Sequence, residues 1–354
     1  MSIETPQQRQ HLGNIQALRG IAALLVVISH LYIIEQKYSP DTLLNSFASF
    51  GMVGVDLFFV ISGFIMIHVA IGCKRGLGAS TEFLFARITR IYPLYWLISL
   101  PLFVLYLWRP DMVFSSVSTA PNFLKSFLLY PDTRIPLLGV GWTLIHEMGF
   151  YIVFAFALVF KRKWLVPFML IWFGALIIGQ QLGYDKLGPV RAILFSPLSF
   201  EFIGGAVAGI FYHKYQGGFA RTSLILAAIL WILPIILLSL SVQGMTEVPY
   251  DRALYFTLPC ALTVYGLASI KSKLPLYSQT LGDWSYALYL THVLSLTVMG
   301  RIWHKFTQDG LIDNVLVLIL MVVGSIFVAG CVHKLAEQPM LKITKRFRAR
   351  LFAK

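Results

Sequence analysis

The sequence predicts an all-α integral membrane protein built as a bundle of about ten transmembrane helices. Of its 354 residues, 57% are hydrophobic and only 13% are charged, and the mean hydropathy is +0.73. A soluble domain has about 45–50% apolar and about 25% charged residues. Apolar stretches of about 20 residues, long enough to cross a bilayer, recur along the whole chain. No long polar region remains, so we expect a single membrane domain over residues 1–354.

Hydropathy places the helices near residues 15–34, 51–71, 83–106, 140–160, 164–182, 192–212, 222–241, 252–270, 281–300 and 315–335. Most of the 29 Lys and Arg residues lie in alternate breaks between these helices and in a basic tail over 336–354. The positive-inside rule then puts both termini in the cytoplasm. Pro339 is expected to end the last helix, because proline lacks the N–H that continues one.

Two weaker patterns concern a loop and a helix contact. The long connection over about 107–139 contains the segment "NFLKSFLLYPD", whose apolar run is too short to span and predicts an interfacial or re-entrant piece. A lid over an outward-facing site and an ordinary amphipathic loop both remain open. In "GGAVAG", Gly205 and Gly209 are four residues apart, which predicts that a neighbouring helix packs closely there.

The net charge of +13 does not indicate a nucleic-acid partner, because the basic residues lie in the breaks between helices, where they determine the orientation of the protein in the membrane. The histidines are scattered, and the sequence contains neither an HExxH motif nor a cluster of cysteines. We therefore expect no metal site and no nucleic acid, and membrane lipids as the surrounding partners.

The first helix carries two ionisable groups, Arg19 and His30, within the segment "RGIAALLVVISH". Eleven positions at 100° per residue return to within about 20° of the same face, roughly 16 Å further along the axis. Because this helix runs outward, Arg19 is expected near the cytoplasmic boundary and His30 about one turn below the outer one. Ionisable groups inside a bilayer usually mark a pathway or a site.

Two carboxyl groups share the predicted depth of His30, since helices 51–71 and 140–160 both run inward. Asp56 and Glu147 are expected about one to two turns below the outer surface. A carboxylate beside His30 would hold its tautomer and raise its basicity, as a general base acting on a hydroxyl requires. A polar network that only orients the helices is the alternative, and Asp56 could simply bond backbone groups.

The inner end of the third helix carries Arg87 and Arg90, an i,i+3 pair on one face. With Arg19 they would form a phosphate-binding patch. The alternative is that they reach toward anionic lipid headgroups. Further along, Tyr289 and His292 lie on one polar stripe of helix 281–300 that is expected to face the bundle interior, and Glu201 is deep without an obvious partner.

Several motifs follow one another in a fixed order along the chain. They are Arg19 and His30 with ten residues between them, "FFVISGF" at 58–64, Arg-x-x-Arg at 87–90 followed by "IYPLYW", "GWTLIHEMGFY" at 141–151, "SYALYLTH" at 285–292 and "EQP" at 337–339. Together they resemble the acyltransferase-3 family of bacterial membrane acyltransferases over essentially the entire chain. The "WTLIHEMGFY" segment is most similar to members that acetylate exopolysaccharide or O-antigen sugars.

This resemblance implies a multi-pass protein of the bacterial cytoplasmic (inner) membrane. It would move an acetyl group from cytoplasmic acetyl-coenzyme A to a hydroxyl of an exported carbohydrate at the outer face. The acceptor would be an exopolysaccharide, an O-antigen or a lipid-linked glycan. By resemblance His30 is the catalytic histidine, and Arg19, Arg87 and Arg90 match arginines required for activity. Some relatives carry a fused C-terminal esterase-like domain; none is expected here, so the chain would acylate the acceptor itself or hand the group to a partner protein.

These inferences combine into one mechanistic hypothesis. The donor phosphates would bind Arg19, Arg87 and Arg90, and the thioester would cross roughly 15 Å of a core about 30 Å thick to reach His30. His30, oriented by Glu147 or Asp56, would remove the hydroxyl proton, although an acyl-histidine intermediate remains open. We assign Trp142, Tyr289 and His292 to acceptor binding. The rival function is a transporter or flippase of acylated sugars, but no internal repeat or matched pair of broken helices is evident.

Overall fold

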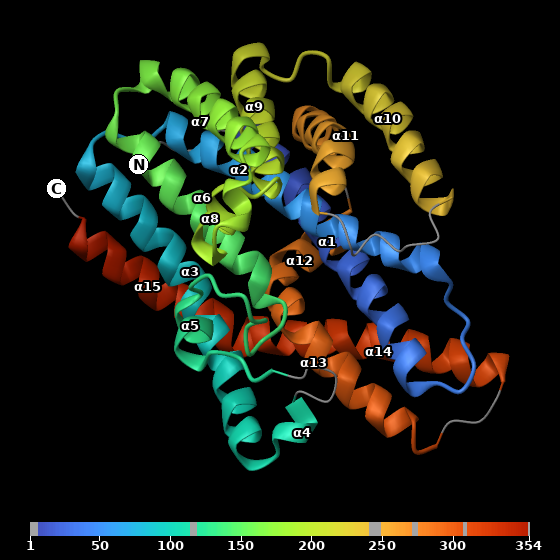
Figure 1. Ribbon diagram of the computed structural model, residues 1–354. Helices are drawn as coiled ribbons and strands as arrows, with labels where there is room; N and C mark the ends of the chain where they lie inside the picture. The colour runs from blue at the N-terminus through green and yellow to red at the C-terminus, as the bar shows by residue number, and fades with distance from the viewer. Residues whose placement is uncertain (1–5, 114–118, 241–248, 271–274, 307–309, 353–354) are drawn as a thin grey trace. The chain divides into compact units, whose positions relative to one another are not determined.

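The computed structural model of the chain describes residues 6–113, 119–240, 249–270, 275–306 and 310–352, and all regular secondary structure in these ranges is helical (Figure 1). The chain forms two compact units. The first unit consists of Met1–Gly72 and Phe200–His333, and the second consists of Cys73–Ser199 and Lys334–Lys354. Each unit therefore combines segments that are far apart in the sequence.

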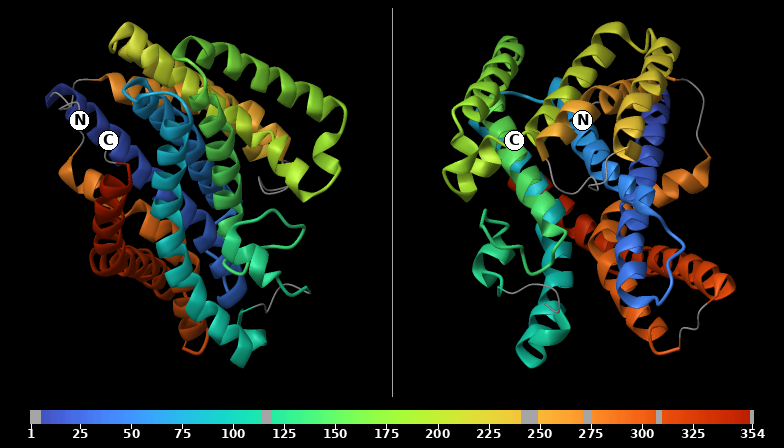
Figure 2. Two further views of the ribbon diagram at one scale, coloured as in Figure 1. Left: turned by 90° about the vertical axis from the view of Figure 1, so that its left-hand side faces the viewer. Right: turned by 45° about the vertical axis from the view of Figure 1, so that its right-hand side comes forward.

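The first unit is organised around α1. Its helices are α1 (Pro6–Tyr38), α2 (Val53–Ile71), α9 (Leu198–Tyr215), α10 (Ala220–Leu240), α11 (Pro249–Ser269), α12 (Leu276–Asp283), α13 (Ser285–Trp303) and α14 (Leu311–Val332), with a 3-10 helix at Ser46–Met52 before α2. Helix α1 packs against α2, α11, α12 and α13, while α10 lies beside α11 (Figures 1 and 2). A single long helix thus contacts most elements of this unit.

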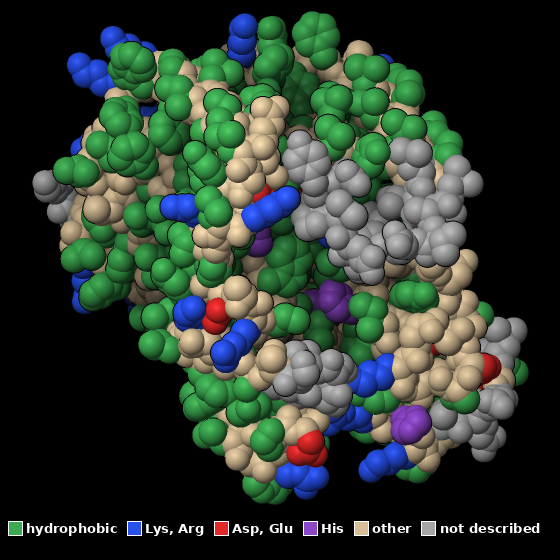
Figure 3. Space-filling model, in the orientation of Figure 1, with side chains coloured by type: hydrophobic (Ala, Val, Ile, Leu, Met, Phe, Trp, Pro, Cys, Tyr) green, Lys and Arg blue, Asp and Glu red, His purple; other side chains and the backbone are tan. Residues whose placement is uncertain are grey.

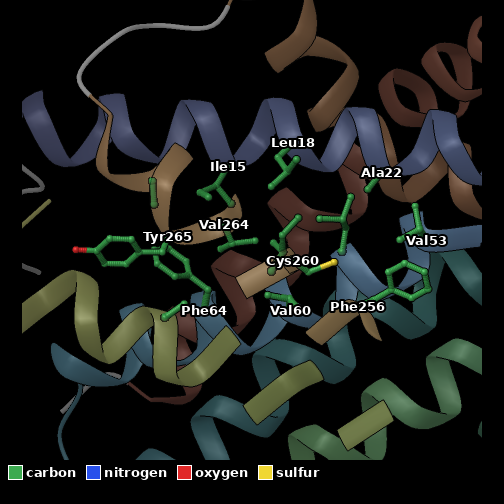
Figure 4. Packing of buried hydrophobic residues seen from close by; sticks show 14 residues of the cluster. Ile15, Leu18, Ala22, Val53, Val60, Phe64, Phe256, Cys260, Val264 and Tyr265 are labelled. Carbon is green, nitrogen blue, oxygen red and sulfur yellow. The ribbon is translucent and has the colours of Figure 1, made fainter. Parts of the chain in front are cut away.

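The core of the first unit is an apolar cluster contributed by α1, α2, α9 and α11 (Figure 4). Leu18, Val60, Phe256 and Cys260 are among its buried side chains, none more than 4% exposed. Cys260, like Cys73 and Cys331, has a free thiol and here packs as a small hydrophobic side chain. This packing holds together four of the helices that carry the polar groups discussed below.

Helices α2 and α9 approach each other so closely that only glycine fits at their contact. A Cβ on Gly205 would lie 1.8 Å from the carbonyl oxygen of Val60, and a Cβ on Gly63 would lie 2.0 Å from that of Phe202. Gly209 similarly faces Phe64 and Ile67 of α2. The prediction that "GGAVAG" is a helix-packing segment is confirmed.

The second unit is built on α3. Its helices are α3 (Leu77–Trp108), α4 (Pro110–Val113), α5 (Phe123–Leu128), α6 (Gly141–Val159), α7 (Leu165–Gln181), α8 (Pro189–Leu194) and α15 (Gln338–Leu351), with 3-10 helices at Arg162–Trp164 and Tyr184–Lys186. Helix α3 lies alongside α6 and also contacts α15 (Figure 2). The backbone of α3 stays helical through Pro93 and Pro101.

The "IYPLYW" motif of α3 fastens the short helix α5 through its backbone. The Tyr92 hydroxyl donates to the Leu128 carbonyl at 2.7 Å, the Tyr95 hydroxyl to Ser126 at 2.7 Å, and the Trp96 indole N–H to Phe127 at 2.8 Å. The last carbonyls of a helix have no partner within it. Three aromatic side chains therefore satisfy the carboxyl end of α5, the segment predicted as an interfacial or re-entrant piece.

Each of the ten predicted ranges contains helix, and seven helices within the described residues are long and apolar enough to span a bilayer. These are Gly13–Tyr38, Ser46–Ile71, Leu77–Trp108, Gly141–Val159, Arg162–Gln181, Pro189–Tyr215 and Ile312–Leu351, while Ala220–Ile236 is a shorter apolar helix. Hydrophobic side chains cover much of the visible surface (Figure 3), and many are strongly exposed, including Leu170 at 66% and Phe327 at 70%. Such a surface suits lipid and not water. The protein is a multi-pass membrane protein.

Three boundaries differ from the prediction. The expected helix 192–212 is divided into α8 and α9 around Pro197, because proline disfavours helical geometry in the residue before it. The expected helix 281–300 starts at Ser285, after the separate helix α12. Pro339 does not end the last helix: α14 continues through a π-helical turn at His333–Glu337 into α15, and this local change of the backbone hydrogen-bond pattern lies directly before Pro339. The predicted basic tail is thus helical up to Leu351, and its last two residues lie outside the described residues.

Candidate active site

Each unit contains a group of interacting polar side chains that includes predicted site residues. In the first unit we call this group the histidine array; it consists of His30, Asp56, Glu201, Arg252, Tyr289 and His292. In the second unit we call it the arginine cluster; it consists of Arg87, Arg90, Glu147 and Tyr151.

The histidine array begins with a contact between α1 and α13. The Nε2 atom of His292 lies 3.4 Å from Nδ1 of His30, and the two rings meet edge to face with centroids 4.8 Å apart. His292 is fully buried, whereas His30 is half-buried. The prediction that the polar stripe of helix 281–300 faces the interior is confirmed, because Tyr289 is also buried.

Backbone carbonyls determine which ring nitrogen of each histidine carries the proton. Nδ1 of His30 lies 2.9 Å from the Val26 carbonyl oxygen, and Nδ1 of His292 lies 3.1 Å from that of Leu288. A carbonyl oxygen can only accept, so each Nδ1 must be the donor. In the neutral form Nε2 of His30 therefore holds a lone pair, and Nε2 of His292 can accept a second, longer hydrogen bond from His30.

Asp56 has a different partner from the one expected. The Nε and Nη2 atoms of Arg252 donate to its two carboxylate oxygens at 3.1 and 2.6 Å, and Nη2 also donates to the Met52 carbonyl at 2.8 Å. The Asp56 carboxylate is fully buried and the Arg252 side chain is 10% exposed. The Val26 carbonyl, one turn earlier on α1, lies at Nδ1 of His30, while Asp56 bonds Arg252.

Tyr289 and Glu201 complete the histidine array. The Tyr289 ring lies 5.8 Å from that of His292, and the phenol is within electrostatic range of Arg252. Glu201, in the first turn of α9, adjoins Asp56. Of the predicted site residues, the structure thus brings His30, Asp56, Tyr289 and His292 into one unit and links them through Arg252.

Arg19 lies on α1 in the same unit and belongs to another local contact. Its Nη1 donates to the Gln16 side-chain oxygen at 3.1 Å, and the Gln16 amide donates to Asp283 of α12 at 2.7 Å. The guanidinium is half-buried, which leaves part of it accessible. Its predicted position, on the same helix face as His30, stays a prediction.

The arginine cluster surrounds the guanidinium of Arg87 with aromatic rings. Its Cζ lies 5.3 Å from the Phe83 ring centroid and 5.5 Å from that of Tyr151, both distances typical of cation–π contacts. The Tyr151 hydroxyl donates to Glu147. The Nε of Arg87 is buried with no hydrogen-bond partner in the part of the chain that the structure describes. An anion would satisfy this donor.

Glu147 and Trp142 both lie on α6 of the second unit. Tyr151 bonds Glu147, which is also within electrostatic range of Arg87. The predicted contact between Glu147 and His30 stays a prediction. Trp142 packs edge to face on His146 with centroids 5.6 Å apart, and its carbonyl lies 2.9 Å from Nδ1 of that histidine. Trp142 is half-buried, and its assignment to an acceptor likewise stays a prediction.

Sequence reasoning missed two functional candidates, Arg252 and Tyr151. Arg252 lies at the start of the predicted helix 252–270, and a cation at a helix end inside a membrane protein, beside a buried carboxylate such as Asp56, is a signal for an ion pair. Tyr151 follows Glu147 by four residues on one helix face, the spacing at which side chains meet. No group of three or more metal-ligating side chains is found among the described residues.

The arrangement offers two kinds of chemistry. A neutral imidazole with a free Nε2 can take a proton from a hydroxyl or attack an acyl carbon. A buried guanidinium with an unused donor can hold a phosphate. The family model for the acyltransferase-3 domain, described as an acyltransferase domain, matches residues 12–333. The chain belongs to the acyltransferase-3 family.

Curated relatives agree with this membership. The exopolysaccharide production protein ExoZ of Rhizobium meliloti (strain 1021) is 32% identical over 264 residues, which cover 71% of this chain and 78% of the relative. The acyltransferase MdmB of Streptomyces mycarofaciens is 26% identical over 390 residues, covering 97% and 95%. The peptidoglycan O-acetyltransferase OatA of Listeria monocytogenes serovar 1/2a is 23% identical over 184 residues, which cover 50% of this chain and 26% of the relative. No solved structure matches the chain. This membrane acyltransferase therefore has relatives whose names refer to exopolysaccharide production and to peptidoglycan O-acetylation.

Proposed function

We propose that this acyltransferase transfers an acetyl group from cytoplasmic acetyl-coenzyme A to a hydroxyl of an exported carbohydrate. An exopolysaccharide, an O-antigen or a lipid-linked glycan would be the acceptor, at the outer face of the bacterial inner membrane, with both termini in the cytoplasm. Two relatives support the carbohydrate, since their names refer to exopolysaccharide production and peptidoglycan O-acetylation. The single observation that carries the chemistry is the free Nε2 of His30, which follows from the Val26 and His292 contacts.

The donor would bind through its phosphates to Arg87 and Arg90, with Arg19 as a further contact. The buried Nε of Arg87, which has no partner among the described residues, fits this assignment because it is a charged donor already free of water. The neighbouring rings of Phe83 and Tyr151 hold the guanidinium in place. Succinyl or longer acyl groups would use the same phosphate contacts, so the geometry does not select acetyl.

His30 would then act as the general base. Its Nε2 takes the proton of the sugar hydroxyl while the hydroxyl oxygen attacks the thioester carbon; the carbon–sulfur bond breaks, and the proton passes to the departing thiolate. As positive charge develops on the ring, the Nδ1–H bonds to Val26 and His292 strengthen. In the acyl-histidine variant, Nε2 itself attacks the thioester carbon and the coenzyme A thiolate leaves; the sugar hydroxyl oxygen then attacks the acyl carbon, the bond to Nε2 breaks, and the hydroxyl proton passes to the thiolate. Both routes use the same lone pair.

The acceptor would lie against Trp142, Tyr289 and His292, whose ring faces and hydroxyl suit a sugar. Asp56 would act indirectly. Its ion pair holds Arg252 of α11 in place, and Arg252 in turn interacts electrostatically with Tyr289 of α13. Glu147 stays a candidate for orienting His30. Proteins of glycan assembly are expected as partners.

Incubating the purified protein with labelled acetyl-coenzyme A and candidate glycans tests the function directly. We expect an alkali-labile ester on the glycan. A flippase would instead move acylated glycan across a proteoliposome membrane and leave the label on the donor, and that result would overturn the proposal.

Replacing His30 by Ala tests the residue. Removing a general base lowers the rate by about 10²–10⁴-fold. His304→Ala is the matched control, because His304 is exposed and also bonds a backbone carbonyl, that of Tyr38, through Nδ1. Both variants should give the same amount of folded protein, and activity retained in His30→Ala contradicts the mechanism.

A further inference from the structure

Glu201 is a buried carboxyl group that the proposed reaction does not use. It lies in the first turn of α9, its side chain is fully buried, and neither carboxyl oxygen has a hydrogen-bond partner among the described residues. An ionised carboxylate taken out of water without a donor costs several kcal/mol. Glu201 therefore needs either a cation or a proton.

The close contact between α2 and α9 places Glu201 beside Asp56. Gly63 packs on the carbonyl of Phe202, the residue after Glu201, and Gly205 packs on that of Val60, one turn after Asp56. Electrostatic interactions accordingly join Glu201 to Asp56 and to Arg252 of α11. Two other titratable side chains face this group: Cys260 interacts with both carboxyl groups, and Tyr289 of α13 with Arg252. Two carboxyl groups thus lie near one guanidinium.

The hydrogen bonds show which carboxyl group is the anion. Arg252 donates to both oxygens of Asp56, and its remaining bond goes to the Met52 carbonyl. No donor of Arg252 reaches Glu201. Both carboxyl groups lie in the first turn of a helix, so the helix dipole favours neither over the other. Asp56 and Arg252 therefore form a closed ion pair, and Glu201 is left without a counter-charge.

We infer that Glu201, Asp56 and Arg252 form a binding site for a single proton, in which Glu201 is a neutral carboxylic acid that donates a hydrogen bond to Asp56. The bound proton balances the charge of the three groups and gives Asp56 a third donor. It also removes the repulsion between two adjacent carboxylates. The bound proton takes no part in the proposed acyl transfer, although the Asp56–Arg252 ion pair beside it also adjoins Tyr289.

A rescue experiment in purified full-length protein tests which carboxyl group holds the proton. Arg252→Met leaves the Asp56 carboxylate without its cation, and we expect it to give the largest fall in Tm of the set. Adding Asp56→Asn removes the unpaired charge and should recover much of the lost Tm. Adding Glu201→Gln should recover little of it, because Glu201 is already neutral. Rescue by Glu201→Gln instead of Asp56→Asn, or equal rescue by both, would overturn the inference.

Infrared spectroscopy gives a second measurement that does not depend on Arg252→Met folding. A protonated carboxyl group has a C=O stretch separate from that of carboxylates, and we expect this band at neutral pH in the unmodified protein. Glu201→Gln keeps the shape and neutrality of the side chain, so this variant should fold with an unchanged Tm and lose the band. A missing band in the unmodified protein, or one that persists in Glu201→Gln, contradicts the inference.

Discussion

The histidine array and the arginine cluster both keep charged or titratable groups away from water, but they do so by different means. In the histidine array, backbone carbonyls bond His30 and His292, and one ion pair joins Asp56 to Arg252. In the arginine cluster, aromatic rings cover Arg87, and a phenol bonds Glu147. The first arrangement determines which atoms carry protons, so we expect it to control kcat. The second leaves a cationic donor unused, so we expect it to control the KM for the acyl donor.

Among the tests of this comparison, we expect the largest effect when the two arginines of the arginine cluster are removed together. In Arg87→Ala/Arg90→Ala, we expect the KM for acetyl-coenzyme A to rise about 100-fold or more with little change in kcat, because each hydrogen bond to a charged group contributes about 1.5–3 kcal/mol. Steady-state kinetics and direct donor binding measure this. Arg109→Ala is the control, since that side chain is 55% exposed and pairs with Asp111 at 3.6 Å. Unchanged donor binding would assign Arg87 and Arg90 to lipid headgroups.

The second prediction concerns the helix contact that supports the histidine array. Gly205→Ala places a Cβ 1.8 Å from the Val60 carbonyl oxygen, so α2 and α9 must move apart. Overpacking of this kind costs about 1–3 kcal/mol, and a lower Tm should report it. Gly174→Ala on α7 is the matched control, because nothing lies within 4 Å of its Cβ position. Equal Tm values for the two variants would show that the array does not depend on this contact.

The smallest effect is expected from a substitution that tests the role of His292. His292→Phe keeps an aromatic ring but removes the acceptor that lies 3.4 Å from His30. Because one hydrogen bond contributes about 0.5–1.5 kcal/mol, we expect kcat to fall about 2- to 10-fold. The KM for the donor should stay constant. His213→Phe is the control, since it breaks a similar contact, 3.2 Å long, with His68. A change in the donor KM alone would contradict the assignment.

Much of the fold was predictable because transmembrane helices can be recognised in a sequence by their apolar composition and their length. All ten predicted ranges contain helix, and the glycine contact of α9 followed from spacing alone. The breaks were harder to predict, since Pro197 interrupts a helix while Pro93 and Pro101 do not. A local sequence does not reveal which proline has its lost hydrogen bond compensated by packing.

The sequence selected several residues of the candidate site, but not Arg252 or Tyr151, and not the pairings between the side chains. Residue type and depth selected His30, Asp56 and His292, because ionisable groups are rare inside a membrane. They did not show that Asp56 binds Arg252, since that ion pair joins residues 196 positions apart. The tautomer of His30 also depends on the Val26 carbonyl, and every residue has a carbonyl, so the sequence carries no sign of it.

In the three hydrogen bonds that attach α5 to α3, one segment contributes side chains and the other contributes only backbone carbonyls. Tyr92, Tyr95 and Trp96 hold α5 by carbonyl oxygens that any amino acid would supply. These three bonds place no requirement on the side chains of α5, although the rings of Phe123 and Phe127 also contact Phe103 of α3. The exposed positions of α5, Leu124 at 71% and Leu128 at 53%, lie outside these ring contacts. An evolving or engineered enzyme of this kind could exchange these two side chains, and with them the surface that the segment presents, while the anchor stays the same.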